Sequence, residues 1–124
     1  MSKVEQVKTY VKNTIQSPFC GSLRKLHRSD IGHCQNINFL QISALENPEQ
    51  LLLSASKILN LKILSLDKCS ELEVLPEEIG QLAALEDLKI YNCKKFKNLH
   101  QSIQRSKKLR RLEIMNCQSF AGMN

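Results

Sequence analysis

The stretch "LKILSLDKC" (Leu61–Cys69) occurs in two further versions, "LEDLKIYNC" (Leu85–Cys93) and "LRRLEIMNC" (Leu109–Cys117). The three begin 24 residues apart and share an apolar residue at positions one, four and six and a cysteine at position nine. The alternation in the middle of each stretch is typical of a half-buried strand. A unit this short cannot bury its own leucines, so we expect the repeats to stack and bury them against one another.

The same period continues between these stretches and before them. Further apolar columns are Leu72, Phe96 and Phe120, then Leu75 and Leu99, then Ile79 and Ile103. An earlier, more degenerate copy, "INFLQISALENPEQLLLSASKI", begins at Ile37, so repeats fill nearly all of residues 37–120. The pattern predicts an α/β leucine-rich-repeat solenoid of about four 24-residue coils, with a short parallel sheet on the concave side and helical or 3₁₀ segments on the convex side.

The first 36 residues do not follow the period. Ser2 with Glu5 forms a capping-box signature, and an apolar helical face follows it, which predicts a helix over about residues 3–15. We expect this helix to cap the first coil, and we divide the chain into residues 1–36, the N-terminal helix and cap, and residues 37–124, the repeat domain.

After Phe120 the sequence offers no similar cap. Leu112 and Ile114 are then expected on an uncovered edge strand, a feature that natural proteins usually cover. The sequence leaves two explanations open: a partner associates through this C-terminal edge, or the chain is a piece of a longer one.

Composition bears on the compartment and on the class of partner. Five cysteines, an odd number, and no Asn-x-Ser/Thr sequon favour a reducing, cytoplasmic location. No stretch approaches the ~18 apolar residues of a membrane span, so we expect no membrane association. A net charge of +6 leaves polyanions among the partners to consider.

The cysteines and histidines do not predict a chemical site. Cys69, Cys93 and Cys117 share one column, which gives a row of side chains rather than ligands that converge on one point, so we expect them to stack inward and bond to neighbouring backbone. The remaining cluster matches no standard zinc spacing; it consists of Cys20, His27, His33 and Cys34. No phosphate-binding loop and no ordered Cys-His-carboxylate set is present, so we expect no metal, no cofactor, no catalytic residue and no enzyme.

The phrase "LSLDKCSELEVLPEEIGQLAALEDLKIYNCKKFKNL" resembles the leucine-rich repeats of plant intracellular immune receptors of the nucleotide-binding, leucine-rich-repeat class (disease-resistance proteins). The resemblance departs at His100 and Gln104, which replace a Pro and a Gly, and at Leu45, which replaces a Cys. It implies a sensing or regulatory module that binds a pathogen effector, a host protein or other domains of a receptor.

Charge is distributed unevenly between successive repeats. Residues 94–111 hold eight Lys and Arg and no acid, whereas residues 67–87 hold seven acids and one base. Translation by one repeat predicts five ion pairs: Glu71–Lys95, Glu73–Lys97, Glu86–Arg110, Asp87–Arg111 and Lys89–Glu113. Four cations stay without a predicted partner: Lys94, Arg105, Lys107 and Lys108. They form a possible basic patch, and the alternative function is therefore a nucleic-acid or acidic-surface binder through residues 94–111, although a solvated face explains the same charges.

The outward side of the predicted sheet is the other candidate surface. Its predicted partner-binding residues are Phe39, Ile63, Asp87, Lys89, Tyr91, Asn92, Arg111 and Met115. Aromatic and aliphatic anchors carry most of the energy of protein interfaces, so we expect Phe39, Ile63, Tyr91 and Met115 to be the anchors. Single exposed apolar residues are also common on ordinary protein surfaces, which leaves that alternative open.

Overall fold

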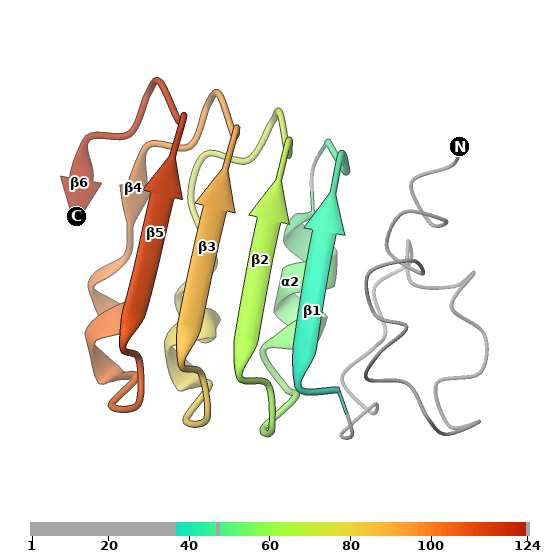
Figure 1. The fold of residues 1–124 in the computed structure, drawn as a ribbon, viewed down its shortest axis with the longest axis vertical. Coiled ribbons are helices and arrows are strands. Elements are labelled where there is room, and N and C mark those ends of the chain that lie inside the picture. The colour runs from blue at the N-terminus through green and yellow to red at the C-terminus, as the bar shows by residue number, and fades with distance from the viewer. Residues whose placement is uncertain (1–36, 47, 124) are drawn as a thin grey trace.

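The computed structural model describes residues 37–46 and 48–123, and its central feature is a parallel four-stranded sheet (Figure 1). The strands, in spatial order, are β1 (Phe39–Ser43), β2 (Ile63–Asp67), β3 (Asp87–Tyr91) and β5 (Arg111–Met115). Residues 24 apart are partners throughout, so that Leu64 pairs with Leu40 on one side and with Leu88 on the other. The predicted period is therefore the register of the sheet, and the prediction of a mixed α/β chain with a short parallel sheet is confirmed.

Helical segments connect the strands and lie behind the sheet in Figure 1. They are the α-helix α2 (Glu49–Ala55) and the 3₁₀ segments η3 (Glu77–Gln81) and η4 (Gln101–Arg105). The sequence of α2, "EQLLLSA", contains no Gly or Pro, whereas η3 follows Pro76 and contains Gly80. Pro and Gly disfavour a regular α-helix at η3. However, η4, "QSIQR", contains neither residue and is also 3₁₀, so composition alone does not decide between the two forms. Two short strands, β4 (Asn98–Leu99) and β6 (Gly122–Met123), pair in parallel to form a second sheet.

The hydrophobic core lies between the four-stranded sheet and these connections. Leu64, Leu88 and Phe96 are completely buried, as the leucine columns predict. Burial changes at the last strand of the sheet, because Leu112 in β5 is 43% exposed although its partner Leu88 in β3 is 0% exposed. Nothing described covers the far side of β5, so the column continues there without its next layer.

The residue that follows each strand of the four-stranded sheet has a left-handed backbone. Ala44, Lys68, Asn92 and Asn116 have φ values of 58°, 59°, 56° and 56°. The amides of the first three donate to the last strand residue of the next coil: Ala44 to Asp67 O at 2.8 Å, Lys68 to Tyr91 O at 3.1 Å and Asn92 to Met115 O at 3.0 Å. The turn thus extends the sheet ladder by one bond, and asparagine suits it because its short polar side chain tolerates this conformation.

The predicted N-terminal helix and cap, residues 1–36, lie outside the described residues, as do Cys20, His27, His33 and Cys34. Within the described residues, no helix has the length and apolar character needed to cross a membrane.

Candidate functional site

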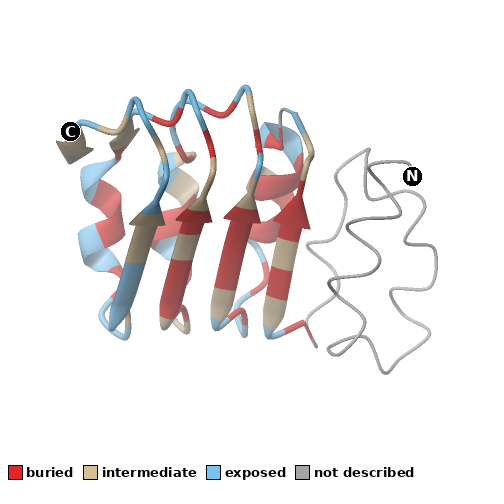
Figure 2. Ribbon diagram, turned by 45° about the horizontal axis from the view of Figure 1, so that its top comes forward, coloured by how far each residue is buried: buried red, intermediate tan, exposed pale blue. Residues whose placement is uncertain are grey.

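The outer face of the four-stranded sheet is the candidate site. Figure 2 shows buried and partly exposed positions alternating along β1 and β3, and greater exposure along β5. In Figure 1, the helical segments all lie behind the sheet, and no described segment crosses its front. Within the described part of the chain, Lys89 and Tyr91 of β3 are partly exposed on this face, and Arg111 and Met115 of β5 are exposed, so these four side chains are accessible to a binding partner.

The four predicted anchors form two separate pairs. Phe39 lies beside Ile63 at the amino ends of β1 and β2, whereas Tyr91 lies beside Met115 at the carboxyl ends of β3 and β5. Met115 is 58% exposed, and the other three are partly buried. Since the pairs occupy opposite ends of different strands, they do not form one continuous apolar patch.

Tyr91 is held in place by the neighbouring strand. Its hydroxyl donates a hydrogen bond to Glu113 Oε1 at 2.5 Å. This bond to an ionised carboxylate raises the pKa of Tyr91 above its ordinary value of 10, because losing the proton would place two negative charges together. A fixed aromatic ring loses little conformational entropy on binding, which suits an interface anchor.

Lys89 and Glu113 are partners in register, yet the predicted ion pair between them is wrong. Glu113 accepts the bond from Tyr91 instead, and Lys89 has no ion pair with any described residue. The Lys89 ammonium is thus available on the same surface as Tyr91.

Asn92 has a structural role that the sequence did not indicate. Its Nδ2 donates to Asp67 Oδ1 at 2.8 Å, and its Oδ1 accepts from Asn116 Nδ2 at 2.6 Å. The side chain therefore links three successive turns, from Asp67 through Asn92 to Asn116. Because its donor and its acceptor are both engaged, we assign Asn92 to the stability of the turns rather than to partner binding.

Asp87 is the predicted site residue that the structure contradicts. It is only 7% exposed, so it does not belong to the accessible surface. Its Oδ1 lies 3.7 Å from Arg110 Nε, while Arg110 Nη2 lies 3.4 Å from Glu86 Oε1. One guanidinium thus spans both acids, which replaces the predicted Asp87–Arg111 pair. Arg111 is left exposed and forms no ion pair with a described residue.

Two other predicted ion pairs form as expected between successive coils. Lys95 Nζ lies 3.0 Å from Glu71 Oε1, and Lys97 Nζ lies 3.1 Å from Glu73 Oε1. The hydrogen bond from Lys95 to Glu71 raises the pKa of Lys95. All four side chains are at least half exposed, so these pairs cancel charge and favour the register more than they stabilise the fold.

The predicted basic patch is not a single surface. Lys94 follows the carboxyl end of β3, whereas Lys107 and Lys108 precede the amino end of β5. Since the two strands are parallel, one position lies where the strands end and the other two lie where the strands begin. Lys94 is therefore separated from the cluster of Arg105, Lys107 and Lys108, whose side chains are exposed and form no ion pair with a described residue.

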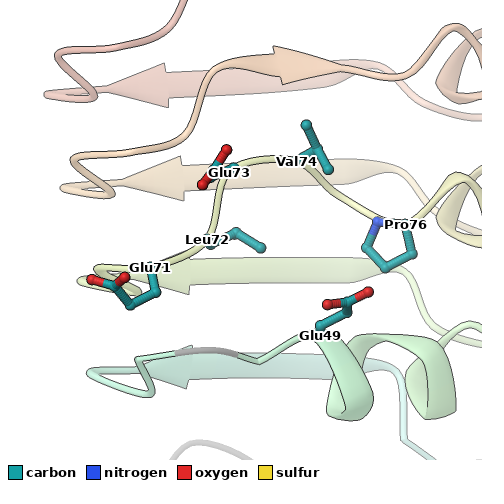
Figure 3. A pocket seen from close by; sticks show the side chains of 6 residues that line it. All are labelled: Glu49, Glu71, Leu72, Glu73, Val74 and Pro76. Atoms are coloured by element: carbon teal, nitrogen blue, oxygen red, sulfur yellow. The ribbon is translucent and has the colours of Figure 1, made fainter.

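Sequence reasoning did not find the pocket drawn in Figure 3, because its walls come from two coils. It has a volume of about 270 Å³ and is lined by Glu49, Glu71, Leu72, Glu73, Val74 and Pro76. Glu71 and Glu73 already pair with Lys95 and Lys97, so the acidic lining is largely neutralised by the next coil.

The three described cysteines line the turns, as the column predicts. Cys93 Sγ contacts Tyr91 O at 3.3 Å, and Cys117 Sγ contacts Ile90 O of the preceding coil at 3.5 Å. Among the described residues, no group of three or more His, Cys, Asp or Glu could hold a metal ion.

The thiols of this row differ in acidity, and two of them, Cys69 and Cys93, are buried. The pKa of Cys69 is raised by its hydrogen bond with Cys93 and by burial, and burial also raises that of Cys117. Both shifts favour neutral, unreactive thiols. The bond with Cys69 lowers the pKa of Cys93 to about 7, but Cys93 is 0% exposed, so reagents in solution do not reach its sulfur.

The chain matches no protein-family model, and no curated protein matches it.

Proposed function

We propose that the repeats form a leucine-rich-repeat solenoid of four coils and that the outer sheet face is its concave, protein-binding side. Three properties support the solenoid: the 24-residue strand register, the shared apolar columns and the left-handed residue after each strand. A stack of this kind presents an extended surface that partners bind.

The observation that carries the proposed function is the surface formed by β3 and β5. Tyr91 and Met115 are adjacent there, with Lys89 and Arg111 on the same face and without ion pairs to described residues. Aromatic residues, Met and Arg are enriched in protein interfaces, and such residues contribute most of the binding energy. We define these four residues as the β3–β5 surface.

The resemblance to plant immune receptors gives this surface a context. We propose a cytoplasmic sensing or regulatory module, without enzymatic activity, that binds a pathogen effector, a host protein or another receptor domain. In each case the ligand is a protein, which the mixture of one aromatic, one thioether and two cationic side chains fits.

The test compares partner capture by three forms of the full chain from plant leaf extract. These are the wild type, the Tyr91→Ala/Met115→Ala variant and the Lys107→Ala/Lys108→Ala variant, each checked by circular dichroism for an intact fold. A protein captured through the β3–β5 surface is lost with the first variant and retained with the second. Calorimetry with that purified partner should then show an affinity at least roughly tenfold weaker for the first variant. Equal affinities would contradict the proposed site.

The alternative function rests on the exposed cluster of Arg105, Lys107 and Lys108. It requires affinity for a generic DNA or RNA duplex that falls steeply with salt, because binding to phosphates releases counterions. Fluorescence anisotropy at several salt concentrations distinguishes the two: tight, salt-dependent duplex binding that the Lys107→Ala/Lys108→Ala variant loses would favour nucleic acid.

A further inference from the structure

The outer edge of β5 carries unpaired backbone groups. β5 is the last strand of the sheet. The Arg111 amide donates to Glu86 O at 3.1 Å, and the Met115 carbonyl accepts from Asn92 N at 3.0 Å, so these residues direct their backbone groups toward β3. Alternate residues of a strand point the opposite way, which directs the amides and carbonyls of Leu112 and Ile114 away from the sheet. Such an edge is a template for another strand.

The core-facing side of the same coil is also incomplete. Leu109, Ile114, Cys117 and Phe120 are only partly buried, and Leu112 is 43% exposed. Their equivalents one coil earlier, which are Leu85, Leu88, Ile90, Cys93 and Phe96, are all 0% exposed. An unpaired edge and an uncovered apolar layer therefore coincide on one end of the described chain.

The charges on β5 indicate which strand fits this end. Leu112 faces the core, and its two neighbours in β5, Arg111 and Glu113, lie on the outer face of the sheet. An antiparallel copy related by a two-fold axis at Leu112 places each Arg111 opposite Glu113 of the other copy. Opposite charges in directly facing cross-strand positions are favourable, and the symmetry forms the contact twice.

We propose that β5 pairs antiparallel with β5 of a second copy of this chain, about a two-fold axis at Leu112, and closes both ends into a symmetric dimer. The axis stands perpendicular to the sheet, so both outer faces lie on one side and both incomplete apolar layers meet on the other. The amide and carbonyl of Leu112 then exchange hydrogen bonds with their symmetry mates. The dimer would place two β3–β5 surfaces side by side, with Arg111 of each engaged by Glu113 of the other copy and with Lys89, Tyr91 and Met115 left for a partner. It does not depend on what those surfaces bind.

The neighbouring register is disfavoured by charge. An axis at Glu113 would set that carboxylate opposite its own copy, and like charges facing each other are destabilising. An axis midway between residues would pair outward with core-facing side chains, which the alternation of a strand forbids. An axis at Ile114 would satisfy the backbone but would set Glu113 opposite Met115 and Arg111 opposite Cys117, with no pair of opposite charges. Of these registers, the one at Leu112 satisfies both the backbone and the side chains.

Sedimentation velocity of the full chain at increasing concentration tests the proposal. We expect a reversible monomer–dimer equilibrium that ends at twice the mass of the chain. Arg111→Glu and Glu113→Arg should each raise the dimer dissociation constant by roughly tenfold, and the double variant should restore it. Leu112→Asp should abolish the dimer, because it buries a charge in the apolar layer.

The Arg111→Glu result also separates specific pairing from general charge. This substitution lowers the positive net charge of +6, so reduced repulsion alone would strengthen association. Lys62→Glu makes the same change of charge on an exposed residue outside β5 and serves as the matched control. A monomer at every concentration would overturn the proposal. So would masses that grow beyond the dimer, as in head-to-tail pairing of β5 with β1, or a dimer that tolerates both single reversals.

Discussion

Replacing Gly80 with alanine should destabilise the protein, although alanine is the better helix former. A Cβ at Gly80 would lie 2.3 Å from the carbonyl oxygen of Ser102 and 2.7 Å from its carbonyl carbon, whereas ordinary contacts begin at 3.4 Å. The segments η3 and η4 would therefore have to separate by about 1 Å, and overpacking of this kind costs about 1–3 kcal/mol. Alanine also has less backbone freedom than glycine in the unfolded chain, which raises the free energy of unfolding by about 0.5–1 kcal/mol. The difference between the two ranges is about 0–2.5 kcal/mol, and because the clash is with backbone atoms rather than with a flexible side chain, we expect a net loss in the free energy of unfolding in the upper half of that range, above about 1 kcal/mol.

The matched control is Gln101, an exposed residue at the start of η4. Gln101→Ala should change stability by less than about 0.5 kcal/mol, because the substitution adds no atom between η3 and η4 and the side chain is exposed. Urea unfolding of the full chain, followed by circular dichroism, gives both values, and an unchanged m-value shows that the unfolded states are comparable. If Gly80→Ala were as stable as the wild type, the close approach of η3 to η4 would not be as described.

Three further sets of substitutions test the burial of the leucine column, the turn at Asn92 and the bond from Tyr91 to Glu113. Leu88→Ala should lower the free energy of unfolding by about 2–5 kcal/mol, whereas Leu112→Ala in the same column should lower it by less than about 1 kcal/mol. Both values are measured by urea unfolding below the concentration at which dimers form. Equal losses would refute the difference in burial between the two leucines. Asn92→Ala should lower the midpoint of thermal unfolding, because it removes two side-chain hydrogen bonds and strains a left-handed backbone. Asn92→Gly should lower the midpoint less, because glycine adopts this backbone without strain. The reverse order would refute the backbone argument. Ultraviolet titration should show one tyrosine ionising above pH ~10, and Tyr91→Phe should remove that late step. The pKa of Tyr91 is higher in the folded than in the unfolded chain, so its contribution to stability is complete below pH ~10 and is lost as the pH rises through the pKa of the folded state. Titration of both tyrosines at the ordinary pKa would refute the bond to Glu113.

The sheet was predictable because a short period fixes it. Leucine columns at a constant spacing determine which residues pair, so the alignment of Leu64, Leu88 and Leu112 follows from the amino-acid sequence by itself. The same translation predicted the ion pairs Glu71–Lys95 and Glu73–Lys97, since it places the two side chains side by side.

The candidate site was less predictable because rotamers decide it. The translation places Asp87 beside Arg111, yet Arg110 reaches across to Asp87 and leaves Arg111 exposed. Likewise, Glu113 bonds to Tyr91 on a diagonal rather than to Lys89 directly opposite. A period specifies which backbone segments are adjacent. Several long side chains can reach each neighbour, however, and small differences in free energy decide which ion pair or hydrogen bond forms.

The constant strand register also constrains how such a chain changes length over evolutionary time. A deletion or duplication of 24 residues leaves every retained column in line, wherever the break falls between Leu40 and Ile114. Within a strand, a shift by a single residue would instead turn every following side chain of that strand to the opposite face. Gene copies of different lengths should therefore differ in whole multiples of this unit, so that recombination between misaligned copies yields foldable proteins with new binding surfaces.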